Sequence, residues 1–121
     1  NRQLTGGEDP CFVETNGRMV LTANYSGGTM SVFPVLRNGL IGSCRYRFAG
    51  HANAHAAAPQ NTAHVHAARF ASNGYVYVTD FSADQLLCHP HRLSLWAWPA
   101  VFHRVKRRVT WPSRPTDAMF M

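Results

Sequence analysis

The feature that most constrains the fold of this chain is an internal repeat. Residues 11–35 read CFVETNGRMVLTANYSGGTMSVFPV, and residues 64–90 read HVHAARFASNGYVYVTDFSADQLLCHP. Each copy runs through a short strand-like segment, an Asn-Gly pair, a β-rich segment, a small polar turn and another β-rich segment. The Asn-Gly pairs lie 57 residues apart and the polar turns 56 apart, so one residue was gained or lost between the copies. Repetition at a fixed period indicates that one supersecondary unit is used twice.

The local chemistry of both copies predicts β-strands. Asn-Gly is the residue pair that a type I′ hairpin turn prefers, because both central residues of that turn need positive φ angles. Residues 19–23 and 75–79 are nearly free of charge, which is typical of central strands that are covered on both faces. We therefore predict an all-β fold of about two β-propeller blades, each an antiparallel four-stranded sheet, at about residues 8–40 and 60–90.

Two blades are few for a stable propeller. A four-stranded blade cannot cover its own two apolar faces, so such units are stable when they are stacked against others. Two stacked copies still leave two outer faces uncovered. We therefore expect this chain alone to be marginally stable, to aggregate, or to associate with itself through the uncovered blade faces.

Short motifs in the repeats point to one family. Residues 8–13 read EDPCFV and residues 23–29 read ANYSGGT; in the second copy, Gln60 precedes His-Val-His at 64–66 and Val-Thr-Asp at 78–80. These motifs resemble the G-x-x-P-x-x-V stretch, the A-N-Y-x-G-G turn and the Q…H-x-H blade of the lactonase-type seven-bladed β-propellers. This is the family of 6-phosphogluconolactonase and carboxymuconate cyclase. The resemblance covers about residues 7 to 88.

The resemblance implies a fold, a substrate class and a site. It implies that the chain holds about a third of a seven-bladed propeller, whose parent activity is hydrolysis of a small-molecule sugar-acid lactone without a metal or organic cofactor. A carboxymuconate-lactonising isomerase is the alternative activity. The family's site draws a His, arginines and a Glu from several blades. Here Ala63 replaces the usual Pro before the first His, and the Arg-His and Asn-Glu motifs of later blades have no match. We therefore expect a fragment of a lactonase propeller that is inactive alone.

His64 and His66 are the candidate catalytic residues. At positions i and i+2 of a strand, both side chains point to one face while Val65 points to the other. A neutral imidazole, with a pKa of about 6.5, suits a general base that activates water for attack on a lactone carbonyl. The alternative is structural, with both rings solvated or bonded to the backbone where the strand starts.

Four other polar residues have structural interpretations. A zinc site is a weaker hypothesis, because His51 or His55 would have to join the H-x-H pair from an Ala-rich segment. We expect that segment to be a flexible connection. Asn24 and Asp80 occupy equivalent strand ends, where short polar side chains commonly hold a turn by bonding to nearby backbone N–H groups.

The cysteines and the hydropathy pattern indicate a compartment. Cys11, Cys44 and Cys88 are an odd, widely spaced set without a C-x-x-C pair, so neither a disulfide framework nor a zinc ribbon is expected. No apolar run approaches the roughly 18 residues of a membrane span. We therefore expect a cytoplasmic protein that does not enter a membrane. Because residue 1 is Asn, we also expect the chain to begin inside a longer protein.

The last part of the chain departs from the repeat. The net charge is +6, and residues 85–121 carry six basic residues against one acidic residue. Residues 91–121 form a basic, Trp-containing tail without an Asn-Gly pair, which we interpret as poorly ordered or as an out-of-frame reading of a propeller gene. A competing hypothesis is a non-enzymatic fragment whose basic tail binds nucleic acid. Basic clusters are usually solvated surfaces, so we do not expect nucleic-acid binding.

Overall fold

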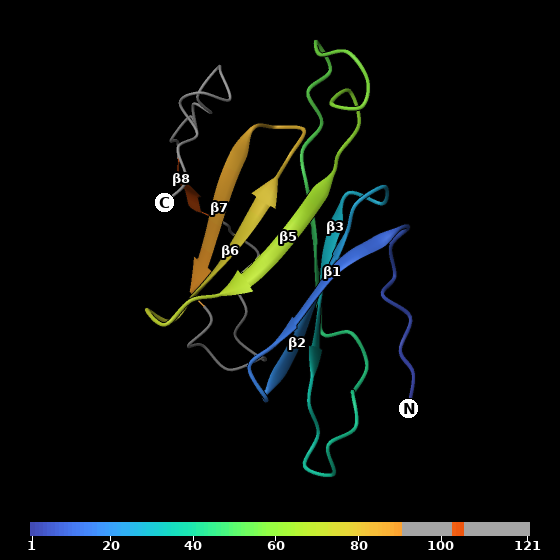
Figure 1. Ribbon diagram of the computed structural model, residues 1–121, viewed down its shortest axis with the longest axis vertical. Helices are drawn as coiled ribbons and strands as arrows, with labels where there is room; N and C mark the ends of the chain where they lie inside the picture. The colour runs from blue at the N-terminus through green and yellow to red at the C-terminus, as the bar shows by residue number, and fades with distance from the viewer. Residues whose placement is uncertain (91–102, 106–121) are drawn as a thin grey trace, which may run out of the picture.

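Two antiparallel four-stranded sheets make up the fold (Figure 1). The computed structural model describes residues 1–90 and 103–105. The first sheet has the order β1 (Pro10–Thr15), β2 (Met19–Asn24), β3 (Thr29–Pro34) and β4 (Tyr46–Ala49). The second has the order β5 (Val65–Phe70), β6 (Tyr75–Asp80), β7 (Gln85–Pro90) and β8 (His103–Val105).

The all-β expectation is confirmed, because the described residues form strands and turns and no helix. Each sheet is a meander in which strands that follow one another in the chain lie side by side and pair. The two predicted central strands, β2 and β6, have a partner on each side. Of the predicted basic tail, only the backbone of β8 is described; the rest lies outside the described residues.

The Asn-Gly turns differ from the predicted type I′ turn. Gly17 and Gly74 have φ angles of +83° and +84°, whereas the asparagines before them are not among the residues with positive φ. Instead, the Oδ1 atom of Asn16 accepts hydrogen bonds from the N–H groups of Arg18 (3.0 Å) and Met19 (2.9 Å). The side chain of each asparagine thus supports the turn, and only the glycine adopts the left-handed conformation.

Each first strand carries a bulge at the same place. The register of β1 with β2 shifts between Pro10 and Phe12, and that of β5 with β6 shifts between Val65 and Ala67. The residues inside the shifts are Cys11 and His66. A bulge inserts one residue that the partner strand does not match, and it turns the strand locally. Cys11 and His66 are therefore equivalent positions of the two blades.

The core lies between the two sheets. Core residues recur at every second position of β2, β3 and β6, as the two-residue period of a strand requires, whereas the bulge in β5 places Val65 and Ala68 three residues apart. Of the second sheet, β5 is the strand that lies against the first sheet. Buried apolar residues form one cluster: Met19, Leu21, Ala23, Met30, Val32, Val65, Ala68, Val76, Val78 and Leu87. The shared core fixes one blade against the other, so loops that follow or precede these strands have defined positions.

The first residues of the chain are tied to the first sheet. The Oγ atom of Ser31, in β3, donates a hydrogen bond of 2.6 Å to the carbonyl oxygen of Thr5. The side-chain amide of Asn1 bonds to both backbone groups of Ile41, donating to its carbonyl oxygen (2.7 Å) and accepting from its N–H (3.1 Å). Strands β2 and β3 are accordingly buried along most of their length.

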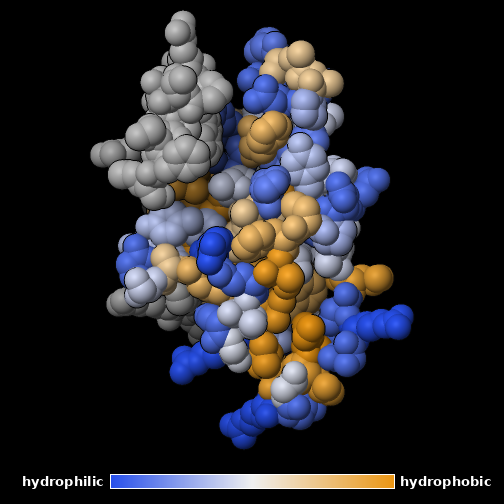
Figure 2. Space-filling view, viewed as in Figure 1, coloured by the Kyte–Doolittle hydropathy of each residue, from blue (hydrophilic) through white to orange (hydrophobic). Residues whose placement is uncertain are grey.

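Exposed apolar side chains remain on the outside. Figure 2 shows apolar residues grouped over the lower part of the view, where β1, β2 and the segment between β3 and β4 lie in Figure 1. Large exposed apolar side chains on these elements include Val13, Leu36 and Leu40. No helix in the described part of the chain is long and apolar enough to cross a membrane.

Candidate functional site

The predicted histidines lie at one end of both sheets, which we call the loop end. It comprises residues 25–28, 50–64 and 81–84, the connections at the upper end of the strands in Figure 1. The connections touch across the two blades. The N–H of Gly50 donates to the carbonyl oxygen of Gly28 at 2.8 Å, and a Cβ atom on Gly28 would lie 2.5 Å from the carbonyl oxygen of Ala63.

His64 is held in one tautomer. Its Nδ1 atom lies 2.8 Å from the carbonyl oxygen of Thr62 and 2.9 Å from Oγ of Ser82. The Ser82 hydroxyl donates its own hydrogen to the same carbonyl oxygen. Since neither oxygen has a hydrogen left for the ring, Nδ1 of His64 is the protonated nitrogen, and Nε2 carries the lone pair.

The two predicted histidines meet around one aromatic ring. The ring centroid of Tyr25 lies 4.5 Å from that of His64 and 5.9 Å from that of His66. His64 is buried, with 7% of its surface exposed, whereas His66 is exposed. The bulge at His66 modifies the simple alternation predicted for the pair, yet both rings remain in one neighbourhood because each contacts Tyr25 of the first blade.

Asp80 makes a different contact from the predicted one. Its side chain is buried, and Oδ2 accepts hydrogen bonds from the backbone N–H of His51 (3.0 Å) and from Nδ1 of the same residue (2.7 Å). His51 is 29 residues away, so Asp80 does not hold its own turn. The segment that we expected to be a flexible connection is therefore bound to β6 at His51.

Asn24, at the equivalent strand end, contacts hydroxyl groups. Its Nδ2 atom donates to Oγ1 of Thr29 at 2.9 Å and lies 3.5 Å from Oγ of Ser31. A Cβ atom on Gly7 would lie 2.5 Å from Nδ2 of Asn24, so the chain passes directly over this side chain. Asn24 thus spans the β2–β3 turn through the hydroxyl group of Thr29, whereas the sequence predicted a bond to a nearby backbone N–H group.

Side chains of β1 also join the two blades along β5. Oε2 of Glu14 accepts a hydrogen bond of 2.7 Å from the backbone N–H of Phe70, and Oε1 accepts one of 3.2 Å from Arg69. The thiol of Cys11 donates to the carbonyl oxygen of His66 at 3.3 Å. Burial, and to a smaller extent the negative charge of Asp9, raise the pKa of Cys11 above its usual value. A thiol with a raised pKa is a poor nucleophile at neutral pH.

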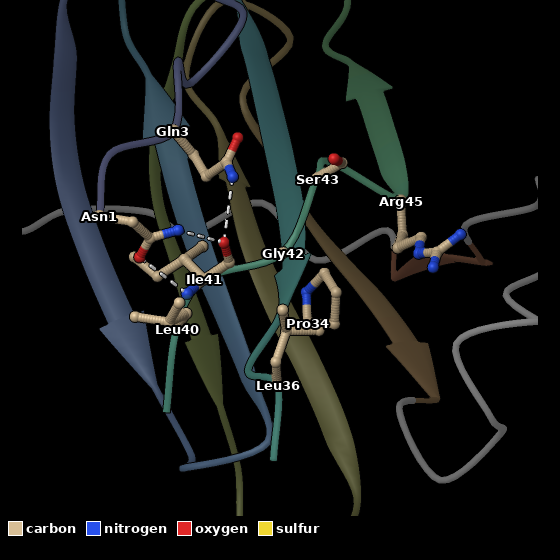
Figure 3. A pocket seen from close by; sticks show the side chains of 9 residues that line it. All are labelled: Asn1, Gln3, Pro34, Leu36, Leu40, Ile41, Gly42, Ser43 and Arg45. Carbon is tan, nitrogen blue, oxygen red and sulfur yellow. Dashed lines mark hydrogen bonds between the residues drawn. The ribbon is translucent and has the colours of Figure 1, made fainter. Parts of the chain in front are cut away.

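The described residues group no set of metal ligands around the histidines. Within residues 1–90 and 103–105, no three His, Cys, Asp or Glu side chains are grouped as metal ligands would be. A hollow of about 460 Å³ lies at the opposite end of the first sheet (Figure 3). Asn1 and Gln3 reach across it to Ile41, and its walls are mostly apolar. It does not contribute to the loop end.

The sequence named the two candidate histidines but not the residues that surround them. Tyr25 and Ser82 stand in the polar turns that define the repeat, so their position was visible but their contact with the other blade was not. Thr62 contacts His64 through its backbone carbonyl oxygen, and the identity of a residue does not predict such a contact. The pairing of His51 with Asp80 joins segments 29 residues apart, and only the packed blades bring them together.

Comparison with known proteins agrees with this architecture. The family described as "Lactonase, 7-bladed beta-propeller" matches residues 1–94. A 6-phosphogluconolactonase of Bacillus subtilis is 36% identical over 89 residues, which is 71% of this chain and 25% of the relative.

Solved structures give the same result. The crystal structure of a candidate 6-phosphogluconolactonase from Bacteroides uniformis superposes with a TM-score of 0.71 at 42% identity, covering 89% of this chain and 31% of the other. A similar candidate from Bacteroides fragilis gives a TM-score of 0.70 at 28% identity, covering 85% and 30%. The chain therefore spans between a quarter and a third of the relatives it matches.

Proposed function

Since this chain belongs to the lactonase family of seven-bladed β-propellers, we propose that it supplies two blades of a protein that hydrolyses a sugar-acid lactone, as 6-phosphogluconolactonase does. We further propose that the chain alone does not complete the catalytic site. The observation that supports a base in these blades is the fixed tautomer of His64, with Nδ1 bound and Nε2 able to accept a proton.

In this proposal the general base is His64, and His66 is the neighbouring catalytic imidazole. Nε2 of His64 takes a proton from water while the water oxygen attacks the lactone carbonyl, and Thr62 and Ser82 hold the ring through Nδ1. The bond from the acyl carbon to the ring oxygen then breaks, and the proton on Nε2 passes to that leaving oxygen. His66, exposed and against Tyr25, is placed to contact the substrate. Stabilisation of the developing oxyanion needs further donors, which these blades do not offer in the family's pattern.

A hydrolysis assay with the purified chain tests the proposal at its broadest. We expect 6-phosphogluconolactone to open at the solvent rate, because general-base catalysis without oxyanion donors lacks the largest contribution to such reactions. Hydrolysis well above that rate would show that the chain forms a complete site.

Binding tests the site itself. We expect a sugar δ-lactone at millimolar concentration to shift the imidazole NMR signals of His64 and His66 and to leave those of His55 unchanged. His64→Gln should remove the shift at His66 if the two rings contact one ligand, and His55→Gln is the matched control. Shifts confined to His55, or none at all, would contradict the proposed site.

The proposal also includes a cytoplasmic location and self-association of the isolated chain. No disulfide joins the cysteines, all of which lie within residues 1–90, and this supports a cytoplasmic location. The exposed apolar side chains on β1 and on the segment between β3 and β4 support self-association of the isolated chain. Light scattering during size-exclusion chromatography should detect species larger than the 13.5 kDa monomer; a monodisperse monomer would contradict self-association.

A further inference from the structure

Another imidazole at the loop end, that of His51, has a setting that the proposed function does not use. The side chain of Asp80 is fully buried, and its Oδ2 atom accepts two N–H groups of His51, one from the backbone and one from Nδ1. The His51 ring itself keeps 45% of its side-chain surface exposed. A buried carboxylate thus holds a solvent-accessible imidazole.

This arrangement defines the chemistry of the ring. Because Nδ1 of His51 is 2.7 Å from a carboxylate oxygen, Nδ1 carries the hydrogen and Nε2 carries the lone pair. His64 differs, since its Nδ1 bonds to neutral oxygens and its ring is buried.

The backbone holds His51 in place. The N–H of Gly50 donates to the carbonyl oxygen of Gly28 at 2.8 Å, which ties the segment to the first blade. A Cβ atom on Gly50 would lie 2.9 Å from Cγ2 of Val65 and 3.2 Å from Oδ1 of Asp80. Glycine therefore permits the close approach that sets the His51 ring against the carboxylate, before any ligand binds.

We propose that His51 and Asp80 form a carboxylate–imidazole dyad that acts as a general base toward water attacking an acyl carbonyl. In hydrolysis, Nε2 takes a proton from water as the water oxygen bonds to the carbonyl carbon. The bond from that carbon to the leaving oxygen then breaks, and the proton on Nε2 passes to the leaving oxygen. The inference rests on the proposed function only where the acyl compound is taken to be a lactone.

The acylating reagent diethyl pyrocarbonate tests the dyad without a lactone. It reacts with the unprotonated ring nitrogen of histidine, and peptide mass spectrometry follows each site separately. His55 is an internal reference, because it is an exposed residue of the same segment whose ring is not held by a carboxylate in the described structure. We expect His51 to react several times faster than His55, because the hydrogen bond from Nδ1 to a carboxylate makes the lone pair on Nε2 more nucleophilic. Equal or slower reaction at His51 would overturn the proposal.

Two substitutions separate charge from shape. Asp80→Asn keeps an acceptor for His51 and removes the charge, so the His51 to His55 rate ratio should fall close to one. Asp84→Asn is the matched control, because Asp84 lies in the next turn and has no contact with His51; it should leave the ratio unchanged. A ratio that survives Asp80→Asn, or that falls equally in Asp84→Asn, would contradict the dyad.

A measurement on the unsubstituted chain guards against a variant that fails to fold. Long-range ¹⁵N–¹H NMR correlations at pH 8 should show His51 as the Nδ1–H tautomer. The Nε2–H tautomer would overturn the proposal. Neither measurement involves a lactone, so a dyad that is confirmed while lactone binding fails would contradict only the proposed function.

Discussion

The two blades share one backbone plan and differ in the chemistry at the same strand end. Asn24 and Asp80 both close the second strand of a sheet, and each is paired with the residue that starts the first strand. Asn24 is a neutral amide that bonds to hydroxyl groups of its own sheet, whereas Asp80 is a carboxylate that binds His51 from the preceding connection. The shared apolar pattern gives two equivalent sheets, and single polar residues determine which groups are bound at the strand ends of each sheet.

The bulge positions repeat this contrast. Cys11 uses its thiol to contact the neighbouring blade, while the equivalent His66 remains exposed beside Tyr25. Glu14 of β1 accepts a backbone N–H of β5, and the residue equivalent to it in β5 is Arg69, a cation. In the first blade these positions therefore contact the second blade, whereas in the second blade the side chain of His66 stays exposed to solvent.

The largest expected effect tests whether the two blades contribute equally to stability. Leu21 in β2 and Leu87 in β7 are both fully buried in the shared core. Leu21→Ala should lower the free energy of unfolding by about 4 kcal/mol, near the upper end for a buried leucine. Leu87→Ala should cost less, because Gln85, a neighbour on the same face of β7, is only half-buried, so the cavity would lie closer to solvent. Thermal unfolding followed by circular dichroism measures both; a larger loss for Leu87→Ala would reverse the comparison.

The next prediction exchanges the two strand-end residues. Asn24→Asp places a carboxylate where no cation is bonded to it and should cost about 3 kcal/mol at pH 7. Asp80→Asn should cost less, because its partner His51 is partly exposed and can turn to water.

The exchange also has a pH signature. Burial raises the folded-state pKa of the carboxyl introduced in Asn24→Asp above its unfolded value, so the folded variant binds more protons and loses stability as pH rises. Chemical unfolding at pH 4 and pH 7 should show the variant recovering most of the difference at pH 4. Equal costs for both substitutions, or no pH dependence, would mean that the two strand ends are interchangeable.

A smaller effect concerns how closely the blades approach. A Cβ atom on Gly28 would lie 2.5 Å from the backbone oxygen of Ala63, and its φ is +62°. Gly17 has a φ of +83° with open space around it. Gly28→Ala should therefore lower the free energy of unfolding by about 2 kcal/mol, because a shift of the backbone adds to the conformational strain. Gly17→Ala should cost about 1 kcal/mol from strain alone. The two midpoints of thermal unfolding measure this; equal shifts would mean that the blades can separate at Gly28 without loss.

The sequence predicted the sheets because the repeat appears twice in one chain. The period and the uncharged runs at 19–23 and 75–79 fixed the central strands, and the resemblance of the motifs identified the family. The predicted type I′ turn was wrong. The asparagine keeps a negative φ, and its side chain stabilises the turn by accepting backbone N–H groups.

The candidate site was predictable only in its named histidines. The H-x-H pair is visible as a pattern, but its environment is set by Thr62 through a backbone oxygen and by Tyr25 from the other blade. The contact of His51 with Asp80 depends on how the β4–β5 connection folds over β6. Such contacts depend on how the two repeats pack together, so the residue pattern of a single strand cannot predict them.

The smallest expected effect compares the two bulge residues as reactive groups. Burial, and then the charge of Asp9, raise the pKa of Cys11, so less of it is thiolate at pH 8 than in an ordinary thiol. Iodoacetamide should therefore alkylate Cys11 more slowly than it alkylates a cysteine-containing peptide, although the residue is exposed. Asp9→Asn should speed the reaction only about twofold, because burial is the larger cause and water screens the charge. Glu8→Gln is the matched control and should leave the rate unchanged. If Cys11 reacted as fast as the peptide, the bulge of the first blade would be as accessible to reagents as the bulge of the second blade at His66. The contrast between the two blades would then not hold at the bulge.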